Sequence, residues 1–481
     1  MASVDKESLR ESIASLEENF VSLNRAGKMP DESKILVQSL LTLIKLMAAL
    51  FLERTTKKTS RNSSKPPSQT DKDDTSLTKK GKKSKGQQEQ NIQSSSFRSV
   101  EHVTVIPVTF CNECGEDLSK VACHHLERRS TIDIIFEKVT EHVDVEVKEC
   151  PFCDAEVVGA FPDTMPHQLQ YGDGIRAYVV NLIVAQMVAL ARVRTMVTTL
   201  IGVKISESTL LGFVMRVHKG LEEWERQTRA ALLKAPSLHC DETSCRVAKK
   251  NYWIHVYSDS GGRRLKMLHP KRGKKAIDDI DMIPKYSGTI IHDCWSSYLS
   301  YVNCLHALCG SHLLRELTFM VEANGYRWAQ RMKALLKSGA RSVTESEEKR
   351  VDEEEYLKYR KHYRTILTQG LQELPEIPPK PRSKRGRMAK SDAHNLHERL
   401  VKYEDAVLRF LHDPTVSFTN NTAERALRMG KVKQKVSGCF RSEEFAHAYC
   451  RVSSYLDTMK AHGYNPIIAL QFVLKGEIPK I

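Results

Sequence analysis

The first pattern of apolar side chains along the chain, near the N-terminus, is typical of helices that pair. Leu36, Leu40, Leu43, Met47 and Leu50 are separated by alternating steps of four and three residues, which is the heptad spacing of a coiled-coil seam. A similar pattern begins further upstream. We therefore expect residues 1–54 to form a helical arm that pairs with other copies of the chain. A plain helical hairpin is the alternative.

The same arm contains the longest apolar run, residues 35–52, whose length is marginal for a membrane span. Lys45 lies at its centre and would cost about 2.5–3.5 kcal/mol in a bilayer. The N-terminus is polar and acidic without a signal-peptide pattern, and the chain has twelve cysteines. We therefore expect no membrane association and a reducing, cytoplasmic compartment.

A module at residues 99–165 combines strand-like alternation with two C-x2-C pairs. Apolar residues alternate with period two at 132–136 and again at 143–147, which predicts a β-hairpin between the pairs. Four thiolates in two such pairs suit a tetrahedral, structural Zn²⁺ site. The expected ligands are Cys111, Cys114, Cys150 and Cys153. The alternatives are unrelated buried thiols, or a ligand set that includes Cys123, His124 or His125.

Residues 166–232 have helical periodicity throughout. The stretch from 192 to 221 predicts a helix, a short turn and a second helix, with Gly202 in the turn and Ser206 as the N-cap of the second helix. This is the helix-turn-helix pattern, in which the second helix can enter a DNA major groove. Because any helical hairpin gives the same pattern, DNA contact and a purely structural role are both open here.

From residue 233 the pattern changes to an α/β fold. Three strands, a short helix, a fourth strand, a fifth strand and a helix follow in that order up to residue 324, which is the order of a ribonuclease-H-like sheet. Residues 325–412 are mainly helical and are expected to be an insertion with a basic loop. The catalytic domain would resume at 413–465, and residues 466–481 are expected to be a C-terminal tail.

Two acids occupy matching places in this expected sheet. Asp241 lies on the first strand and Asp293 ends the fourth, and in a ribonuclease-H-like order these two strands are neighbours. Each acid follows apolar residues, so an uncompensated carboxylate would be costly there. A pair of divalent cations would compensate the charge and could serve an in-line phosphoryl transfer. Such a site requires a third carboxylate from later in the chain.

Glu424 can supply that third carboxylate, although local sequence favours another role. Asn421 followed three residues later by Glu424 fits a capping box, in which the Glu side chain turns back to the helix start. A Glu that caps in this way cannot simultaneously reach a metal. The requirement for a third acid leads us to expect the metal role for Glu424.

The net charge of +15 is concentrated in two tracts. Residues 54–86 hold eleven Lys or Arg against three Asp or Glu, and residues 380–390 hold six basic residues and no acid. Residues 55–98 contain almost no apolar side chains and are expected to be a flexible basic linker. Both tracts suit either solvated linkers or loose contact with nucleic-acid phosphates.

Several motifs in order along the chain resemble one known family. They are SSKPPSQ (63–69), the two cysteine pairs, YGDGIRAYVVNLI (171–183), ISESTL (205–210), HCDETSCRV (239–247), IIHDCWSSY (290–298), CGSHLLREL (309–317) and FTNNTAERALR (418–428). Together they identify the chain as similar to a DDE transposase, the large transposase of the insertion-sequence IS66 family. The resemblance covers about residues 60–460.

The resemblance implies an active site and its cofactors. The catalytic triad would be Asp241, Asp293 and Glu424, holding two Mg²⁺, or Mn²⁺, per active site, and the four cysteines of the 99–165 module would hold a structural Zn²⁺. The family's C-x2-H-x2-R element falls on Cys309, His312 and Arg315. Asp154 departs from the family pattern, since Gly is usual after the second cysteine pair.

The resemblance also implies partners. These are double-stranded DNA at element ends and target sites, further copies of the chain in a homodimer or larger homo-oligomer, and small accessory transposition proteins, in a bacterial cytoplasm at the nucleoid. Candidate DNA contacts are His312, Arg315, Arg425, Arg428 and Lys431, with Lys433 and Lys435 on the same basic run and Trp295 and Tyr298 near the cleavage point. A core role for His312 and a solvated face for the basic run are the alternatives.

Two other functions are weighed against transposition. The chain could be a non-catalytic DNA-binding protein that uses the zinc module and the helical region, with the sheet as a scaffold. It could also be a ribonuclease-H-like nuclease acting on RNA–DNA hybrids or branched DNA. Three acids at compatible places disfavour the first alternative, and the insertion with several DNA-binding segments disfavours the second.

Overall fold

The structure is a computed structural model, and it describes residues 6–63, 103–132, 138–202, 204–377 and 390–481. Two compact units are formed, each from two chain segments. The first unit contains Met1–Gln88 with Glu223–Thr458, and the second contains Glu89–Glu222 with Met459–Ile481. Several predicted segments lie mostly outside the described residues. They are the basic loop at 380–390, the linker at 55–98 with the SSKPPSQ motif, and the first half of the expected hairpin at 132–136.

A five-stranded mixed sheet forms the centre of the first unit. Its strands are β3 (Ser237–Val247), β4 (Lys250–Ser258), β5 (Arg264–His269), β6 (Thr289–His292) and β7 (Leu305–Leu308), in the spatial order β5-β4-β3-β6-β7. β3 pairs antiparallel with β4 and parallel with β6, and β6 pairs parallel with β7. The first and fourth strands of the sheet are therefore neighbours, as the sequence order predicts.

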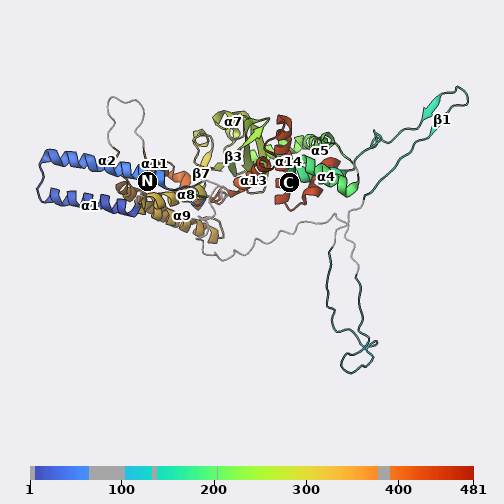
Figure 1. The fold of residues 1–481 in the computed structure, drawn as a ribbon, viewed down its shortest axis with the longest axis horizontal. Coiled ribbons are helices and arrows are strands. Elements are labelled where there is room, and N and C mark those ends of the chain that lie inside the picture. The colour runs from blue at the N-terminus through green and yellow to red at the C-terminus, as the bar shows by residue number, and fades with distance from the viewer. Residues whose placement is uncertain (1–5, 64–102, 133–137, 203, 378–389) are drawn as a thin grey trace. The chain divides into compact units, whose positions relative to one another are not determined.

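Alternation along the strands gives this sheet two different faces. On one face Leu238, Cys240 and Ile290 belong to an apolar cluster with α7 (Lys274–Ile280), and Leu232 of α6 (Glu222–Leu233) joins it. The other face is covered over β3 and β4 by α13 (Asn421–Ser437) (Figure 1). Because residues two apart share a face, Asp241 lies on the side that α13 covers.

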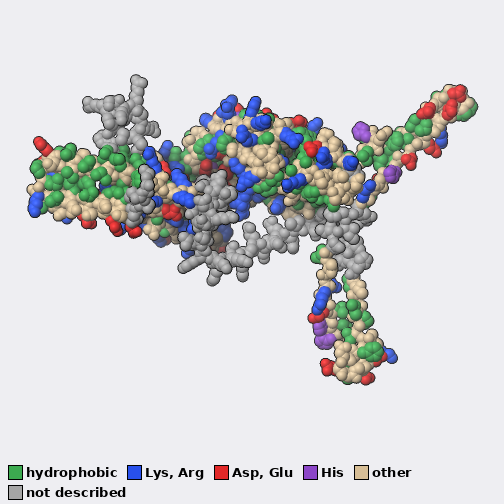
Figure 2. Space-filling model, in the orientation of Figure 1, with side chains coloured by type: hydrophobic (Ala, Val, Ile, Leu, Met, Phe, Trp, Pro, Cys, Tyr) green, Lys and Arg blue, Asp and Glu red, His purple; other side chains and the backbone are tan. Residues whose placement is uncertain are grey.

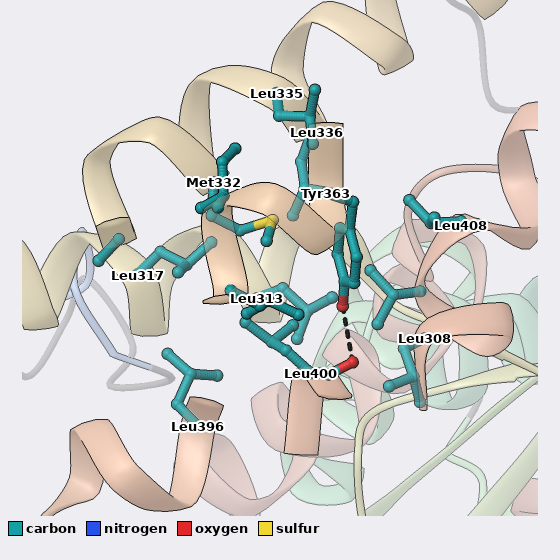
Figure 3. Close-up of a cluster of buried hydrophobic side chains, with 14 of the residues drawn as sticks. Leu308, Leu313, Leu317, Met332, Leu335, Leu336, Tyr363, Leu396, Leu400 and Leu408 are labelled. Carbon is teal, nitrogen blue, oxygen red and sulfur yellow. Dashed lines mark hydrogen bonds between the residues drawn. The ribbon is translucent and has the colours of Figure 1, made fainter. Parts of the chain in front are cut away.

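The expected insertion is helical and well packed. It contains α9 (Arg327–Glu345), α10 (Glu353–Glu373), α11 (Asp392–Lys402) and α12 (Glu404–His412), and it follows α8 (Gly310–Asn324). Their buried leucines interdigitate with Met332 and Tyr363, and the Tyr363 hydroxyl donates a 2.8 Å hydrogen bond to the Leu400 carbonyl (Figure 3). This cluster also includes Ile291 of β6, so the insertion packs directly on the sheet.

The N-terminal arm is a helical hairpin of α1 (Lys6–Arg25) and α2 (Asp31–Thr55) (Figure 1). Apolar side chains gather on its surface (Figure 2), and the heptad residues Leu36, Leu40, Leu43 and Met47 are exposed. α2 is long and apolar enough to cross a membrane, the one such helix in the part of the chain that the structure describes. In the arm, however, Lys45 pairs with Glu17 of α1 at 2.9 Å.

The inner end of α2 is fixed to the insertion by Glu53. This buried carboxylate accepts hydrogen bonds from the backbone N–H groups of Asp392 (2.7 Å) and Ala393 (3.1 Å), at the first turn of α11, and from the Asn324 amide (3.1 Å). A carboxylate at a helix N-terminus satisfies free N–H donors and the helix dipole. The arm is therefore attached to α8 and α11.

The second unit contains the expected helix-turn-helix. α4 (Leu190–Ile201) ends at Gly202, whose φ of +67° is left-handed, and α5 (Glu207–Gly220) begins with the Ser206 hydroxyl accepting a hydrogen bond from the Thr209 N–H at 3.1 Å. The preceding helix is split: α3 (Asp173–Val180) continues into a π-helical turn, Asn181–Ala185, whereas the helical periodicity of the sequence predicts regular helix in this region.

Residues 466–481 are not a tail throughout. Pro466–Lys475 form α15, whose apolar side chains Ala469, Leu470 and Val473 are buried against α3 and α5. The apolar content of the segment explains the difference, since five of its ten residues are Ile, Leu or Phe, which would be costly to expose in a solvated tail. The C-terminal segment therefore completes the second unit.

The cysteine module contains two similar turns. In each C-x2-C pair the first cysteine's carbonyl accepts a 2.9 Å hydrogen bond from the residue four positions later, Gly115 or Asp154. Both donor residues have a left-handed backbone, with φ of +78° at Gly115 and +55° at Asp154. The strands described in this module are β1 (Val147–Glu149) and β2 (Glu156–Val158), which pair around the second turn. Val147 therefore pairs with Val158, whereas the sequence predicted that 143–147 would pair with 132–136.

Candidate active site

The two aspartates meet at one edge of the sheet. The parallel register of β3 and β6 pairs His239 with Ile291. Asp241 lies two residues beyond His239, and Asp293 lies two residues beyond Ile291. Both side chains therefore leave the same face of adjacent strands at the point where β6 ends.

Their ionisation shows that they share one environment. Burial raises the pKa of Asp241 well above its usual value, and the neighbouring charge of Glu242 adds to the rise. The charges of Asp293 and Glu424 raise it further, although the backbone N–H of Glu242 opposes the shift. Burial also raises the pKa of Asp293, against the N–H of Trp295 and two nearby arginines. The charges of Asp293 and Glu424, from two distant segments, thus act on Asp241, although the carboxylate oxygens of the three acids do not gather within 4.8 Å of one another.

Glu424 does not cap its own helix. α13 begins at Asn421 and its N-cap is Asn420, which makes no side-chain cap hydrogen bond, so the capping box expected from Asn421 and Glu424 is absent. The Glu424 carboxylate instead turns toward α8, where its Oε1 lies 3.7 Å from His312 Nδ1 and 3.8 Å from an Arg315 nitrogen. Tertiary contacts override the local capping signal, because Asn420, the residue before the helix, is hydrogen-bonded to Cys240 and Cys309.

Asn420 connects the elements that surround the site. Its amide donates to the Cys240 carbonyl at 2.7 Å, and its Oδ1 lies 3.0 Å from His239 Nδ1. Its backbone N–H donates to Cys309 Sγ at 3.2 Å, and its carbonyl accepts the Glu424 N–H at 3.2 Å. Asn420 is 2% exposed. The residue therefore ties β3 and the start of α8 to the first turn of α13.

A second polar group lies on the opposite face of β3. The buried Glu242 carboxylate accepts from the Tyr298 hydroxyl at 2.6 Å and from Arg272 Nε at 2.8 Å. The Arg272 guanidinium lies over the rings of Trp295 (4.2 Å) and Trp253 (5.0 Å). This network stabilises β3 beside Asp241, on the face of the strand opposite the Asp241 side chain.

The basic candidates have different surroundings. Arg425 and Arg428 are exposed on α13, while Lys431 Nζ donates to the Ser244 hydroxyl and carbonyl of β3. Burial lowers the pKa of Lys431 and of Lys433. His312 is partly buried, and burial together with the Arg315 charge lowers its pKa to about 4. At neutral pH the His312 imidazole is therefore neutral.

The four cysteines expected to bind zinc lie in the two turns of the 99–165 module. Backbone N–H groups lower the pKa of Cys111 and of Cys150, the first cysteine of each pair. The structure does not gather the four sulfur atoms at one point. The single group of three or more potential ligands within 4.8 Å of one another in the described ranges is Cys309, His312 and Glu424.

Comparison with known proteins decides the family. The sequence profile described as "Transposase IS66 family" matches residues 168–448, which is more than half of the chain and spans every acid of the candidate site. The chain belongs to the IS66 transposase family. A search of curated proteins finds no match. An IS66 transposase is an enzyme that acts on DNA, and DDE transposases use divalent metal ions.

Two site residues of this IS66 transposase were missed from the sequence. Asn420 was overlooked because Asn421 beside it fits the capping box, and only the fold shows which of the two is buried. Arg272 lies in a polar stretch between a strand and a helix, where a basic residue carries no signal of its own. The aromatic residues that enclose it are Trp253 on β4 and Trp295 in the loop after β6, which are 42 residues apart in the sequence.

Proposed function

We propose that this transposase cuts and joins DNA at the ends of an insertion sequence, with Asp241, Asp293 and Glu424 as its metal-binding carboxylates on a ribonuclease-H-like core. The observation that carries the proposal is the electrostatic interaction of these three acids at one edge of the sheet. The strand order β5-β4-β3-β6-β7, with three antiparallel strands followed by two parallel ones, supports the core assignment.

The donor set fits hard divalent cations. All three groups are carboxylates. The raised pKa of Asp241 and of Asp293 reflects chiefly their burial, with nearby acidic charges adding to the rise at Asp241 only, and a bound cation would offset the cost of ionising both groups. Glu424 Oε1 is buried and has no hydrogen-bond partner, so it is available as a ligand. When two Mg²⁺ are bound, such a site gains Lewis acidity toward both the entering and the leaving oxygen of a phosphodiester.

The residues of the chain would hold the reacting groups in line. In cleavage, the oxygen of a water molecule forms a bond to phosphorus and loses its protons to solvent, while the P–O3′ bond breaks and the 3′ oxygen gains a proton. In joining, the released 3′-hydroxyl attacks a target phosphorus and the target P–O3′ bond breaks. No protein side chain becomes covalently attached to DNA in either step. Arg425 and Arg428, both exposed on α13, are proposed to contact phosphates near the acids.

The remaining segments suit DNA recognition and assembly. The α4–α5 helix-turn-helix is proposed to contact element ends, and the cysteine module to bind a structural Zn²⁺. The exposed heptad face of α2 is proposed to pair protomers. A cytoplasmic, nucleoid-associated location and a role for accessory transposition proteins follow from the family and are part of the proposal.

Asp241→Asn tests the catalytic assignment. We expect cleavage and strand transfer of labelled element ends in Mg²⁺ to fall at least a thousandfold, while end binding measured by gel shift stays within about threefold. Asp278→Asn, on exposed α7, is the matched control and should cleave normally. Equal loss of binding and cleavage in Asp241→Asn would count against a metal role. Cleavage of RNA–DNA hybrids in preference to element ends would instead favour a nuclease.

A further inference from the structure

Cys309, His312 and Glu424 form a compact group of different ligand types beside the proposed catalytic acids. Their sulfur, nitrogen and oxygen atoms all lie within 4.8 Å of one another. Cys309 is the N-cap of α8, His312 lies in the first turn of α8, and Glu424 lies in the first turn of α13. The N-termini of α8 and α13 thus bring the three side chains close together.

Two atoms of this group are buried without a hydrogen bond. His312 Nδ1 and Glu424 Oε1 both lack a partner and point toward each other at 3.7 Å, which is too long for a hydrogen bond. A buried polar atom left unpaired costs about 1–3 kcal/mol. Two such atoms facing each other therefore indicate a bound group that would satisfy both.

The third member, Cys309, is a buried thiol whose pKa is raised by burial and by the charge of Glu424, although backbone N–H groups beside the sulfur oppose the rise. A bound cation would have to displace the thiol proton, and the N–H groups would then support the sulfur. Cys309 is 1% exposed, and its sulfur accepts the Asn420 N–H at 3.2 Å. The backbone N–H groups of Ser311 and His312 at the start of α8 also face the sulfur. Such N–H groups stabilise sulfur when it carries negative charge.

The chemistry of the group selects a borderline transition metal. A thiolate, a neutral imidazole and a carboxylate suit Zn²⁺ with a water molecule in the fourth position, whereas Mg²⁺ prefers oxygen ligands alone. Cys309, the N-cap of α8, and His312, in the first turn of that helix, are three residues apart, a short spacing of the kind that paired zinc ligands use. The Arg315 guanidinium lies 3.8 Å from Glu424 and opposes a cation, so it would weaken the site without removing it.

We propose that Cys309, His312 and Glu424 form a Zn²⁺ site that competes with the catalytic centre for Glu424. The inhibitory part of this proposal rests on the proposed catalytic role of Glu424. On binding, the Cys309 thiol releases its proton to solvent and Zn²⁺ gains three protein bonds. Glu424 then faces α8 and is withdrawn from Asp241 and Asp293, so a zinc-loaded chain would be unable to cut DNA.

Cobalt absorption tests the binding part. Full-length protein is first loaded with one equivalent of Zn²⁺ to fill the cysteine module, and Co²⁺ is then titrated while thiolate-to-cobalt charge-transfer absorption is recorded. We expect one further equivalent of Co²⁺ to bind in the parent and in Cys439→Ser, a control at a partly exposed thiol. Cys309→Ser should lose the charge-transfer band, and His312→Gln should weaken Co²⁺ binding at least tenfold. Arg315→Ala should tighten it.

Inhibition of cleavage tests the competition. Each variant is assayed in excess Mg²⁺ with and without micromolar Zn²⁺, and its activity is divided by its own activity in Mg²⁺ alone. Zn²⁺ should lower the cleavage activity of the parent and of Cys439→Ser at least tenfold, whereas it should lower the activity of Cys309→Ser less than twofold. Thermal melts check that the variants are folded. If Cys309→Ser does not fold, His312→Gln takes its place as the variant that should resist inhibition by Zn²⁺.

The outcomes separate the two proposals. Equal Zn²⁺ inhibition in the parent and in Cys309→Ser, or a charge-transfer band that does not depend on Cys309, overturns the zinc site even when Mg²⁺-dependent cleavage is normal. A parent that binds Co²⁺ through Cys309 but never cleaves element ends overturns the proposed function instead, and the zinc site is then decided by absorption alone.

Discussion

The side-chain amide of Asn420 donates a 2.7 Å hydrogen bond to the carbonyl of Cys240, the residue immediately before Asp241. Through its own carbonyl, Asn420 also accepts the Glu424 N–H. One buried side chain thus sets the separation between the strand that bears the first acid and the helix that bears the third. Geometry of this kind matters in phosphoryl transfer, because a displacement of about 1 Å can cost a hundredfold in rate.

We expect Asn420→Ala to lower cleavage at least a hundredfold and the free energy of unfolding by about 1–3 kcal/mol, since the Cys240 carbonyl loses its donor. The adjacent Asn421→Ala is the matched control, because Asn421 is exposed and makes no side-chain cap. The Mg²⁺ concentration that gives half-maximal cleavage should rise in Asn420→Ala alone. A fall in stability without any change in Mg²⁺ dependence would reduce Asn420 to a purely structural role.

Metal-free protein should be destabilised by its own active site. Because the folded pKa of Asp241 is raised, ionisation of this carboxyl costs stability as pH rises from its unfolded value of about 4 through its folded value. Asp241→Asn should therefore raise Tm in EDTA at pH 7.5, where 1 kcal/mol corresponds to about 2–4 °C. The difference should shrink at low pH.

The matched control for this prediction is Asp278, whose pKa is shifted in the opposite direction from that of Asp241. Hydrogen bonds from Tyr301 and Lys274 lower the pKa of Asp278, so Asp278→Asn should not raise Tm. Added Mg²⁺ should raise Tm of the parent and leave Asp241→Asn unchanged, because only the parent binds it. A lower Tm for Asp241→Asn than for the parent in EDTA would contradict a raised pKa of Asp241 in the folded protein.

Arg272→Ala should destabilise the protein by about 3 kcal/mol, because Glu242 is buried and would lose a charged partner. Urea unfolding followed by circular dichroism measures the change. Lys275→Ala removes an exposed pair with Asp279 and should change the free energy of unfolding by less than about 0.5 kcal/mol. Arg272→Lys should not restore stability, since Lys cannot reproduce the planar contact with Trp295.

The heptad face of the arm makes a prediction about assembly. Leu40 is 56% exposed within one chain, so Leu40→Glu should leave the fold intact while it weakens self-association at least tenfold. Light scattering over a range of protein concentrations measures the change, and Gln38→Glu, an exposed position on the same helix, is the control. Identical mass profiles for the parent and both variants would show that protomers pair elsewhere.

Much of the fold could be predicted because it depends on local pattern. Alternation identified the strands of the sheet, and Gly202 with Ser206 marked the turn between α4 and α5. The adjacency of the strands of Asp241 and Asp293 followed from strand order. The helical character of the insertion was equally clear, because its apolar residues recur at helical spacing and form a common core with Tyr363 (Figure 3).

What could not be predicted depends on contacts between distant segments. The choice between Asn420 and Asn421 as N-cap depends on the carbonyl of Cys240, 180 residues earlier. The attachment of the arm through Glu53 depends on the start of α11, 339 residues later. Helix α15 was also missed, since residues 466–481 were expected to be a tail; its burial depends on α3 and α5, which come much earlier in the chain.

Glu424 follows Asp293 by 131 residues, and the whole insertion lies between them. A ribosome adds about 5–20 residues per second, so the last carboxylate leaves the ribosome roughly 7–26 s after the second. The helix-turn-helix at α4–α5 leaves earlier still. With α4–α5 as the proposed DNA-binding segment, a nascent chain would engage DNA near its own gene before it possesses a complete cutting site, and the order of synthesis would itself delay the first cut.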